Sequence, residues 1–158
     1  MTGLVYSKAD IFRRFIAYLI DEVIACILIY VPILGGIVST VYILTKDAIA
    51  YEITKNPDFK NKSIGKKIMG LEVVSLEGKD INWEVSVRRN LPFAVASVFG
   101  ILPIIGWLVG MVLGIIIDII EFFLVLTDNN GRRLGDRLAN TQVVSSECLY
   151  KRDDIIDI

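Results

Sequence analysis

The stretch FRRFIAYLIDEVIACILIYVPILGGIVSTVYILTKDAIAYEIT, residues 12–54, decides the fold of this chain. It is mainly apolar, and it is much longer than the roughly 20 residues that one helix needs to cross a bilayer. Pro32 and Gly35 lie near its middle, where they favour a turn. We therefore predict a hairpin of two transmembrane helices, near residues 13–32 and 35–54.

A second apolar block, residues 88–127, has the same layout, with Pro103 and Gly106 near its middle. It predicts two further helices, near residues 86–103 and 106–127. The expected fold class is an all-α membrane protein with four transmembrane helices arranged as two hairpins.

Both blocks contain charged residues in apolar surroundings. These residues are Arg14, Asp21, Glu22, Lys46, Asp47, Asp118 and Glu121. Each such residue costs roughly 2.5–3.5 kcal/mol at the centre of a membrane helix on insertion scales. A chain tolerates that cost where the charges pair, face a polar cavity, or act on an ion or a proton. The sequence therefore predicts a membrane protein with a polar interior.

The composition limits the classes of function. Of the 158 residues, 54% are hydrophobic, well above the average for a soluble domain, and the length suits a single domain over residues 1–158. The absence of histidine removes histidine bases and histidine metal ligands, so we expect no enzyme, catalytic residue, metal or cofactor. The net charge of −1 gives no reason to expect nucleic acid as a partner. Cys26 and Cys148 are expected to be reduced thiols.

The basic residues indicate the topology. With four spans, every cluster of Lys and Arg falls on one side of the membrane, and the two turns on the other side carry no charge. Because positive charge favours the cytoplasmic side, both termini and the loop at residues 55–85 are predicted to be cytoplasmic. The alternative is one span per block, since Val23–Thr45 carries no charge, but it places the nine basic residues from Lys46 to Arg89 outside.

Two cytoplasmic segments follow the helices. The sequence MGLEVVSLEGKDINW, residues 69–83, predicts a short β-hairpin with Glu77-Gly78 in the turn, and Thr141–Val144 are expected to add a third strand. Residues 145–158 form a polar tail that we expect to fray.

The two halves of the chain resemble each other. Pro32 aligns with Pro103 and Asp47 with Asp118, a shift of 71 positions. IGKKIMGLEVV at 64–74 aligns with LGDRLANTQVV at 134–144 at a shift of 70. These matches predict a duplication, and two spans per unit make the repeats parallel, related by an axis along the membrane normal.

At these residues the chain resembles the RDD family of small prokaryotic membrane proteins, named for one arginine and two aspartates. RRFIAYLID at 13–21 assigns the arginine to Arg14 and the first aspartate to Asp21. YILTKDAI, SIGKKIMGLEVV and RRLGDRLANTQVV match the later family segments. They place the second aspartate at Asp136, with Asp47 as the alternative. The resemblance implies a multi-pass protein of the prokaryotic inner membrane. Most members have no assigned function, and sodium/proton antiport has been ascribed to some.

Asp118 and Glu121 are one helical turn apart, so both carboxylates face one way and suit a shared monovalent cation or proton. The alternative is that they reach toward the interface. Arg14 and Asp21 share a helix face two turns apart, so their side chains meet only when extended, and a partner from another helix or subunit is an equal alternative. They form either a structural ion pair or part of an ion site. The candidate ion or substrate residues are thus Arg14, Asp21, Asp47, Asp118 and Glu121.

A second group of candidates lies in the cytoplasmic motif, namely Gly65, Lys66, Lys67, Gly135, Asp136 and Arg137. Basic loops of this kind also suit contact with anionic lipid headgroups. The leading prediction is transport of a cation, a proton or a small solute by a homo-oligomer in the lipid bilayer, because four helices leave little room for a path. The alternative is a non-catalytic scaffold or assembly factor whose buried charges specify helix pairing.

Cysteine labelling tests the predicted topology. In a variant with Cys26 and Cys148 replaced by serine, Lys60→Cys should react with a membrane-impermeant thiol reagent only after the cells are opened, because the loop at 55–85 is cytoplasmic. Leu34→Cys should react from outside in intact cells. Labelling of position 60 in intact cells would contradict the four-span arrangement.

Overall fold

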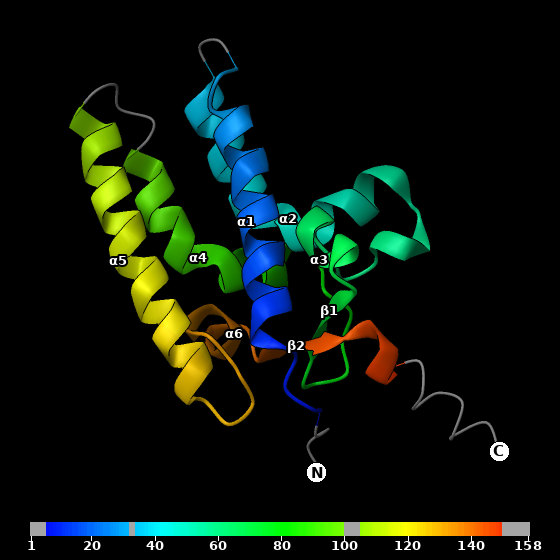
Figure 1. Cartoon of the computed structure of the whole chain (residues 1–158). Coiled ribbons are helices and arrows are strands. Elements are labelled where there is room, and N and C mark those ends of the chain that lie inside the picture. Colours follow the sequence, from blue (N-terminus) through cyan, green and yellow to red (C-terminus); the bar gives the residue numbers. More distant parts are fainter. Residues whose placement is uncertain (1–5, 32–33, 100–104, 150–158) are drawn as a thin grey trace, which may run out of the picture.

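A computed structural model describes residues 6–31, 34–99 and 105–149 of the chain. Its long helices are α1 (Ile11–Leu28), α2 (Gly35–Thr54), α4 (Trp83–Phe99) and α5 (Ile105–Thr127). They lie as two neighbouring hairpins, α1 with α2 and α4 with α5 (Figure 1). The predicted all-helical character of the long segments is confirmed. The turns predicted at Pro32 and Pro103 lie outside the described residues.

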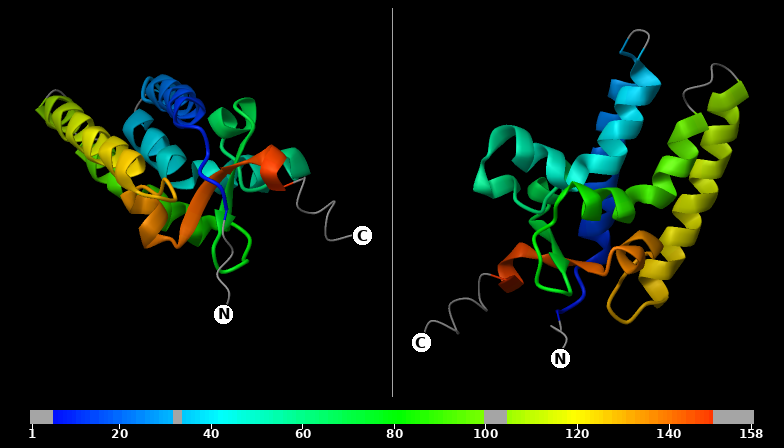
Figure 2. Two further views of the ribbon diagram at one scale, coloured as in Figure 1. Left: turned by 60° about the horizontal axis from the view of Figure 1, so that its bottom comes forward. Right: turned by 180° about the vertical axis from the view of Figure 1, so that it is seen from behind.

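The short elements follow each hairpin in the same order. The first hairpin leads through a 3₁₀ turn, η1 (Pro57–Phe59), to helix α3 (Ile64–Ile68) and strand β1 (Leu71–Ser75). The second leads to helix α6 (Leu134–Leu138) and strand β2 (Thr141–Ser145). The sheet and α6 gather near one end of the long helices, as Figures 1 and 2 show from three sides.

The sheet differs from the predicted hairpin. Among the described residues it has two strands, β1 and β2, which pair antiparallel with Val73 opposite Val143. The predicted turn at Gly78 is present, but the chain after it does not return along β1, so the hairpin prediction was wrong. Instead of forming a second strand, the chain enters α4, where the side chain of Asn82 accepts a hydrogen bond from the backbone N–H of Val85 and so caps the helix. The long-range pairing instead buries the apolar side chains of Val73 and Val143.

Helix α4 begins at Trp83, three residues before the predicted start at 86, and it bends along its length (Figure 2). Pro92 lies inside the helix, where its ring removes one backbone hydrogen bond and clashes with the carbonyl four residues earlier. The bend turns the first half of α4, which contains Arg89, away from the direction of its second half (Figure 1).

The long helices expose many apolar side chains, and about as many polar as apolar side chains are buried. Phe12, Leu19, Val23 and Ile27 of α1 are exposed, as are many aliphatic side chains of α5. The segment Leu108–Thr127 of α5 is long and apolar enough to span a membrane, and only 11% of it is buried. No other helix of the described residues meets the same test. A helix so apolar and so little buried is a better match to lipid than to the core of a soluble protein.

Two glycines allow the short helices to pack closely on the long ones. A β-carbon on Gly65 would overlap the carbonyl oxygen of Ala17 in α1, and one on Gly135 would overlap the carbonyl oxygen of Arg89 in α4. Because both obstacles are helix backbone, they cannot move aside. These positions therefore require glycine for space rather than for a special backbone angle.

We predict that Gly135→Ala destabilises the protein, because the added methyl group forces α6 away from α4. Overpacking of this kind typically costs about 1–3 kcal/mol, which lowers the melting temperature by roughly 2–4 °C for each kcal/mol in a chain of this size. Gly114→Ala in α5 is the control, since its new methyl group would meet only the β-carbon of Ala96 at 3.8 Å. Equal melting temperatures for the two variants in detergent would contradict the close packing.

Candidate functional site

Asp47 of α2 is fully buried and links three elements. One of its oxygens lies 2.6 Å from Nζ of Lys66 in α3. The other accepts a hydrogen bond of 3.1 Å from the amide of Asn90 in α4, and it lies 3.6 Å from Nε of Arg89 in the same helix. Burial lowers the pKa of Lys66 to about 8, against the opposing effect of Asp47. The side chain thus remains mainly protonated at neutral pH.

Asp136 of α6 is the second fully buried aspartate. It lies 2.9 Å from Nη2 of Arg89, 3.1 Å from Nη2 of Arg14 and 3.4 Å from Nε of Arg133. Burial alone would raise its pKa, but the three guanidinium groups outweigh burial and lower the pKa to about 2. Asp136 is therefore a permanent anion held by several arginines.

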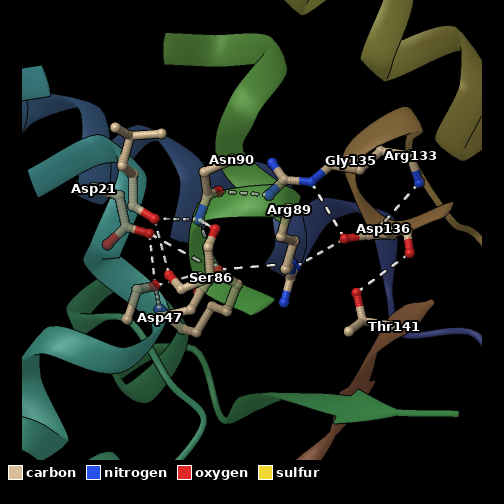
Figure 3. A network of polar contacts seen from close by, with 12 residues as sticks. Asp21, Asp47, Ser86, Arg89, Asn90, Arg133, Gly135, Asp136 and Thr141 are labelled. Carbon is tan, nitrogen blue, oxygen red and sulfur yellow. Dashed lines mark hydrogen bonds and ion pairs between the residues drawn. The ribbon is translucent and has the colours of Figure 1, made fainter. Parts of the chain in front are cut away.

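These contacts form a chain of alternating charges through the interior (Figure 3). It runs from Lys66 to Asp47, Arg89, Asp136 and finally Arg14. Each of the five side chains comes from a different helix: α3, α2, α4, α6 and α1. We call these five residues the charge chain. Removing an inner member would take one ion-pair partner away from each of its two neighbours in the chain.

Asp21 of α1 binds the beginning of α3. Its carboxylate accepts hydrogen bonds of 2.6 Å from the hydroxyl of Ser63 and 2.8 Å from the backbone N–H of Gly65. It also lies 4.0 Å from Nζ of Lys66. Of the two alternatives expected for Arg14, a partner from another element is the one observed, because Arg14 contacts Asp136 and the carbonyl of Gly131 and does not pair with Asp21. Both residues bind other elements rather than each other.

Glu121 of α5 serves α6 in a similar way. Its carboxylate accepts the backbone N–H of Leu134 at 2.6 Å and lies 3.4 Å from the N–H of Gly135. Asp118, one turn earlier, accepts a hydrogen bond of 2.7 Å from the hydroxyl of Tyr18 in α1. The two carboxylates therefore have separate partners. Both border a hollow between the beginning of α1, at Ile11 and Phe15, and the second half of α5.

The motif predicted to be cytoplasmic contains both inward-facing and outward-facing residues. Lys66 and Asp136 are buried members of the charge chain. Lys67 instead contacts Asp58 and the ring of Phe59 at the surface, and Arg137 pairs with Asp128.

The sequence interpretation missed Arg89, Asn90 and Arg133, all of which are buried. A usable signal was present for Arg89, because it stands within the apolar second block, as Arg14 does in the first. Asn90 and Arg133 carried no comparable signal.

A groove separates α1 from α5. It has a volume of about 300 Å³ and is bordered by Tyr18, Glu22 and Asp118 among mainly apolar side chains. Glu22 is 30% exposed, and its charged neighbour is Lys46 at 3.8 Å. Among the described residues, no cluster of acidic or sulfur ligands suited to a metal ion is found.

A double-mutant cycle tests the buried pair Asp47–Lys66. Asp47→Asn and Lys66→Met should each destabilise the protein strongly, typically by about 3–5 kcal/mol for a broken buried pair. The double variant should be destabilised by about 1–3 kcal/mol less than the sum of the two single-variant effects. The measured quantity is the free energy of unfolding in mixed micelles. The exposed pair Lys79–Glu77, at 2.8 Å, is the matched control and should show no coupling. Additive effects at Asp47 and Lys66 would contradict a direct pair.

Comparison with known proteins gives one result. No functionally curated protein and no solved structure matches the chain. The RDD family model matches residues 40–140, which include Asp47, Lys66, Arg89 and Asp136. Arg14 and Asp21, to which the resemblance assigned the family arginine and first aspartate, precede the matched residues. Since the match covers more than half of the chain, the protein belongs to the RDD family of membrane proteins.

Proposed function

We propose that this protein is a four-span exchanger of monovalent cations or protons in the prokaryotic cell membrane, with both termini in the cytoplasm. The observation that carries the proposal is a pair of half-buried carboxylates, Glu22 and Asp118, on opposite sides of the groove between α1 and α5. Neither belongs to the charge chain, so both are free to change protonation without breaking it.

The four-span arrangement is supported by the distribution of side chains on the helices. Apolar residues of α1, α2, α4 and α5 are exposed on the outside, where lipid would cover them. From Gly35 to Asp47, α2 rises about 18 Å, which is more than half of a hydrocarbon core of about 30 Å. A span through α2 would therefore hold Asp47 inside the bilayer, where only a paired charge is tolerated.

The carboxylates of the interior divide into two classes. Asp21, Asp47, Glu121 and Asp136 are all bound by backbone N–H groups or by cationic side chains. Such fixed partners suit a structural role and not the release of a transported ion. Asp118 instead accepts one hydrogen bond from Tyr18, a donor that can stay in place while a proton or cation binds at the second oxygen.

We propose also that the chain arose by duplication, with α1–α2–α3–β1 equivalent to α4–α5–α6–β2. The element order supports this, and the sheet pairs Val73 with Val143, residues that the shift of 70 makes equivalent. Gly65 packs on Ala17 of α1, and Gly135 packs on Arg89 of α4. Ala17 and Arg89 are therefore equivalent positions, which aligns α1 with α4 at a shift of 72.

Hydrogen bonds between the two proposed repeats agree with that register. Asp47 accepts from Asn90, and its proposed equivalent Asp118 accepts from Tyr18. The two donors are again 72 positions apart. Each aspartate thus binds the first helix of the other hairpin, as a pseudo-two-fold axis along the membrane normal requires.

A second candidate function is a non-catalytic scaffold or assembly factor. The closure of the charge chain favours it, because fixed ion pairs specify how helices pack without moving an ion. Under this proposal the groove between α1 and α5 would receive a helix of a partner or of a second copy. The two candidates differ in whether the wild-type protein carries any ion flux.

We predict that Asp118→Asn abolishes coupled flux while the protein still folds. The amide oxygen keeps the acceptor for Tyr18, but it does not titrate. In proteoliposomes with Na⁺, K⁺ and pH gradients, flux should fall at least tenfold relative to the wild type, about the effect expected for loss of an essential proton-transfer group. Glu22→Gln should also lower the flux.

Glu84→Gln is the control, because Glu84 is an exposed carboxylate that pairs with Arg88 at the surface. It should leave both flux and melting temperature unchanged. Unchanged flux in Asp118→Asn would contradict the role of Asp118. If the folded wild-type protein carries no flux under any of the gradients, the exchange proposal fails and the scaffold function takes its place.

A further inference from the structure

A small cavity lies inside the buried network, apart from the groove between α1 and α5. Its volume is about 50 Å³. The charged residues that border it are Arg14, Asp21, Lys46, Lys66, Arg89 and Arg133. Five of these six side chains are cationic. The anionic members of the charge chain, Asp47 and Asp136, do not border it.

The single carboxylate at the cavity is already occupied. Asp21 accepts hydrogen bonds from Ser63 and from the backbone of Gly65. Among the described residues Lys46 makes one ion-pair contact, with Glu22 at 3.8 Å, and it also lies over the rings of Tyr18 and Phe93. The wall of the cavity therefore carries more positive than negative charge, although the buried network as a whole contains carboxylates.

Arg89 supplies unused hydrogen-bond donors at this wall. It is fully buried, and none of its three side-chain nitrogens makes a hydrogen bond of good geometry to any described residue. Nε and Nη2 retain ion-pair contacts with Asp47 and Asp136, whereas Nη1 has no such partner in the described part of the chain. Figure 3 shows that one terminal nitrogen of Arg89 carries no dashed line.

A guanidinium group has five N–H donors, and a buried donor that is left without an acceptor destabilises the folded protein. An anion in the cavity would accept such a donor and also neutralise part of the surrounding positive charge. Water would satisfy the donor but not the charge. The combination of an unpaired guanidinium and a cationic wall thus favours an anion over water alone.

We propose that this cavity binds one small monovalent inorganic anion of the halide class. The volume has room for a halide with a water molecule, and it is too small for a phosphate headgroup with its glycerol. The charged residues at its wall come from α1, α2, α3 and α4 and from the start of α6, so the anion would join the two hairpins and the short helices. This ligand is separate from the cation or proton proposed for the groove.

Because the anion binds the folded state, it should raise stability with concentration. Full-length protein in detergent is heated in sodium chloride, with sodium gluconate added to keep the ionic strength and the sodium concentration constant. We expect a saturable rise of roughly 5 °C or more in melting temperature once chloride is far above its dissociation constant. Bromide should replace chloride in this assay.

Variants of two lysines locate the effect. Lys46→Met removes a cation from the cavity wall, and it should raise the half-saturating chloride concentration at least tenfold, whereas Lys46→Arg should restore the wild-type value. Lys62→Met is the matched control, because Lys62 is another partly covered lysine, pairs with Glu72 at 3.1 Å and does not border the cavity. It should keep the wild-type response.

Crystals grown in sodium bromide provide a direct test that does not depend on any variant folding. One peak of anomalous scattering within hydrogen-bond distance of Arg89 is expected. Absence of that peak in well-ordered crystals would overturn the proposal and assign water to the cavity. A chloride response that is equal in the wild type and in Lys46→Met would overturn it as well.

Discussion

The contact between Arg89 and the two aspartates Asp47 and Asp136 holds the rest of the structure in place. All three side chains are fully buried, and they come from α4, α2 and α6. In an apolar setting no member can be left alone, since an unpaired buried charge costs several kcal/mol. The position of α4 relative to α2 is therefore tied to the position of α6. Lys66 and Arg14 extend the same constraint to α3 and α1.

The short helices α3 and α6 turn this constraint into a defined geometry. Each begins at the surface of a long helix, with glycine at the point of closest approach. Each also directs its first backbone N–H groups at a carboxylate, Asp21 for α3 and Glu121 for α6. The N-terminus of a helix carries a partial positive charge. Both carboxylates are therefore stabilised by the helix dipole as well as by the hydrogen bonds. Pairing of β1 with β2 then fixes the two units to each other.

Much of the helical fold could be predicted from the sequence, because long apolar blocks and their central Pro and Gly are local signals. The charged residues inside these blocks were also visible. Their partners were not, since burial decides which charges meet, and burial depends on contacts distant in sequence. Arg14 and Asp136 are 122 positions apart, and Asp21 binds Gly65 through its backbone, which no residue type reveals. The β-hairpin prediction failed for the same reason, because β1 pairs with β2, 70 positions away. The expected strand at Thr141–Val144 is confirmed, as part of β2.

The proposed duplication gives a physical reason for the open groove. With α1 equivalent to α4 and α2 equivalent to α5, the interface between α2 and α4 is equivalent to that between α5 and α1. The first is closed, since Ser86 and Asn90 of α4 approach the backbone of Leu44 in α2, and Asn90 binds Asp47. The second retains the equivalent contact, from Tyr18 to Asp118, but is otherwise a groove. A tyrosine is longer than an asparagine, so the same bond forms across a wider gap. Under the proposed duplication, one interface became the fixed core, and its equivalent kept a carboxylate beside open space, where the proposed ion or proton would act.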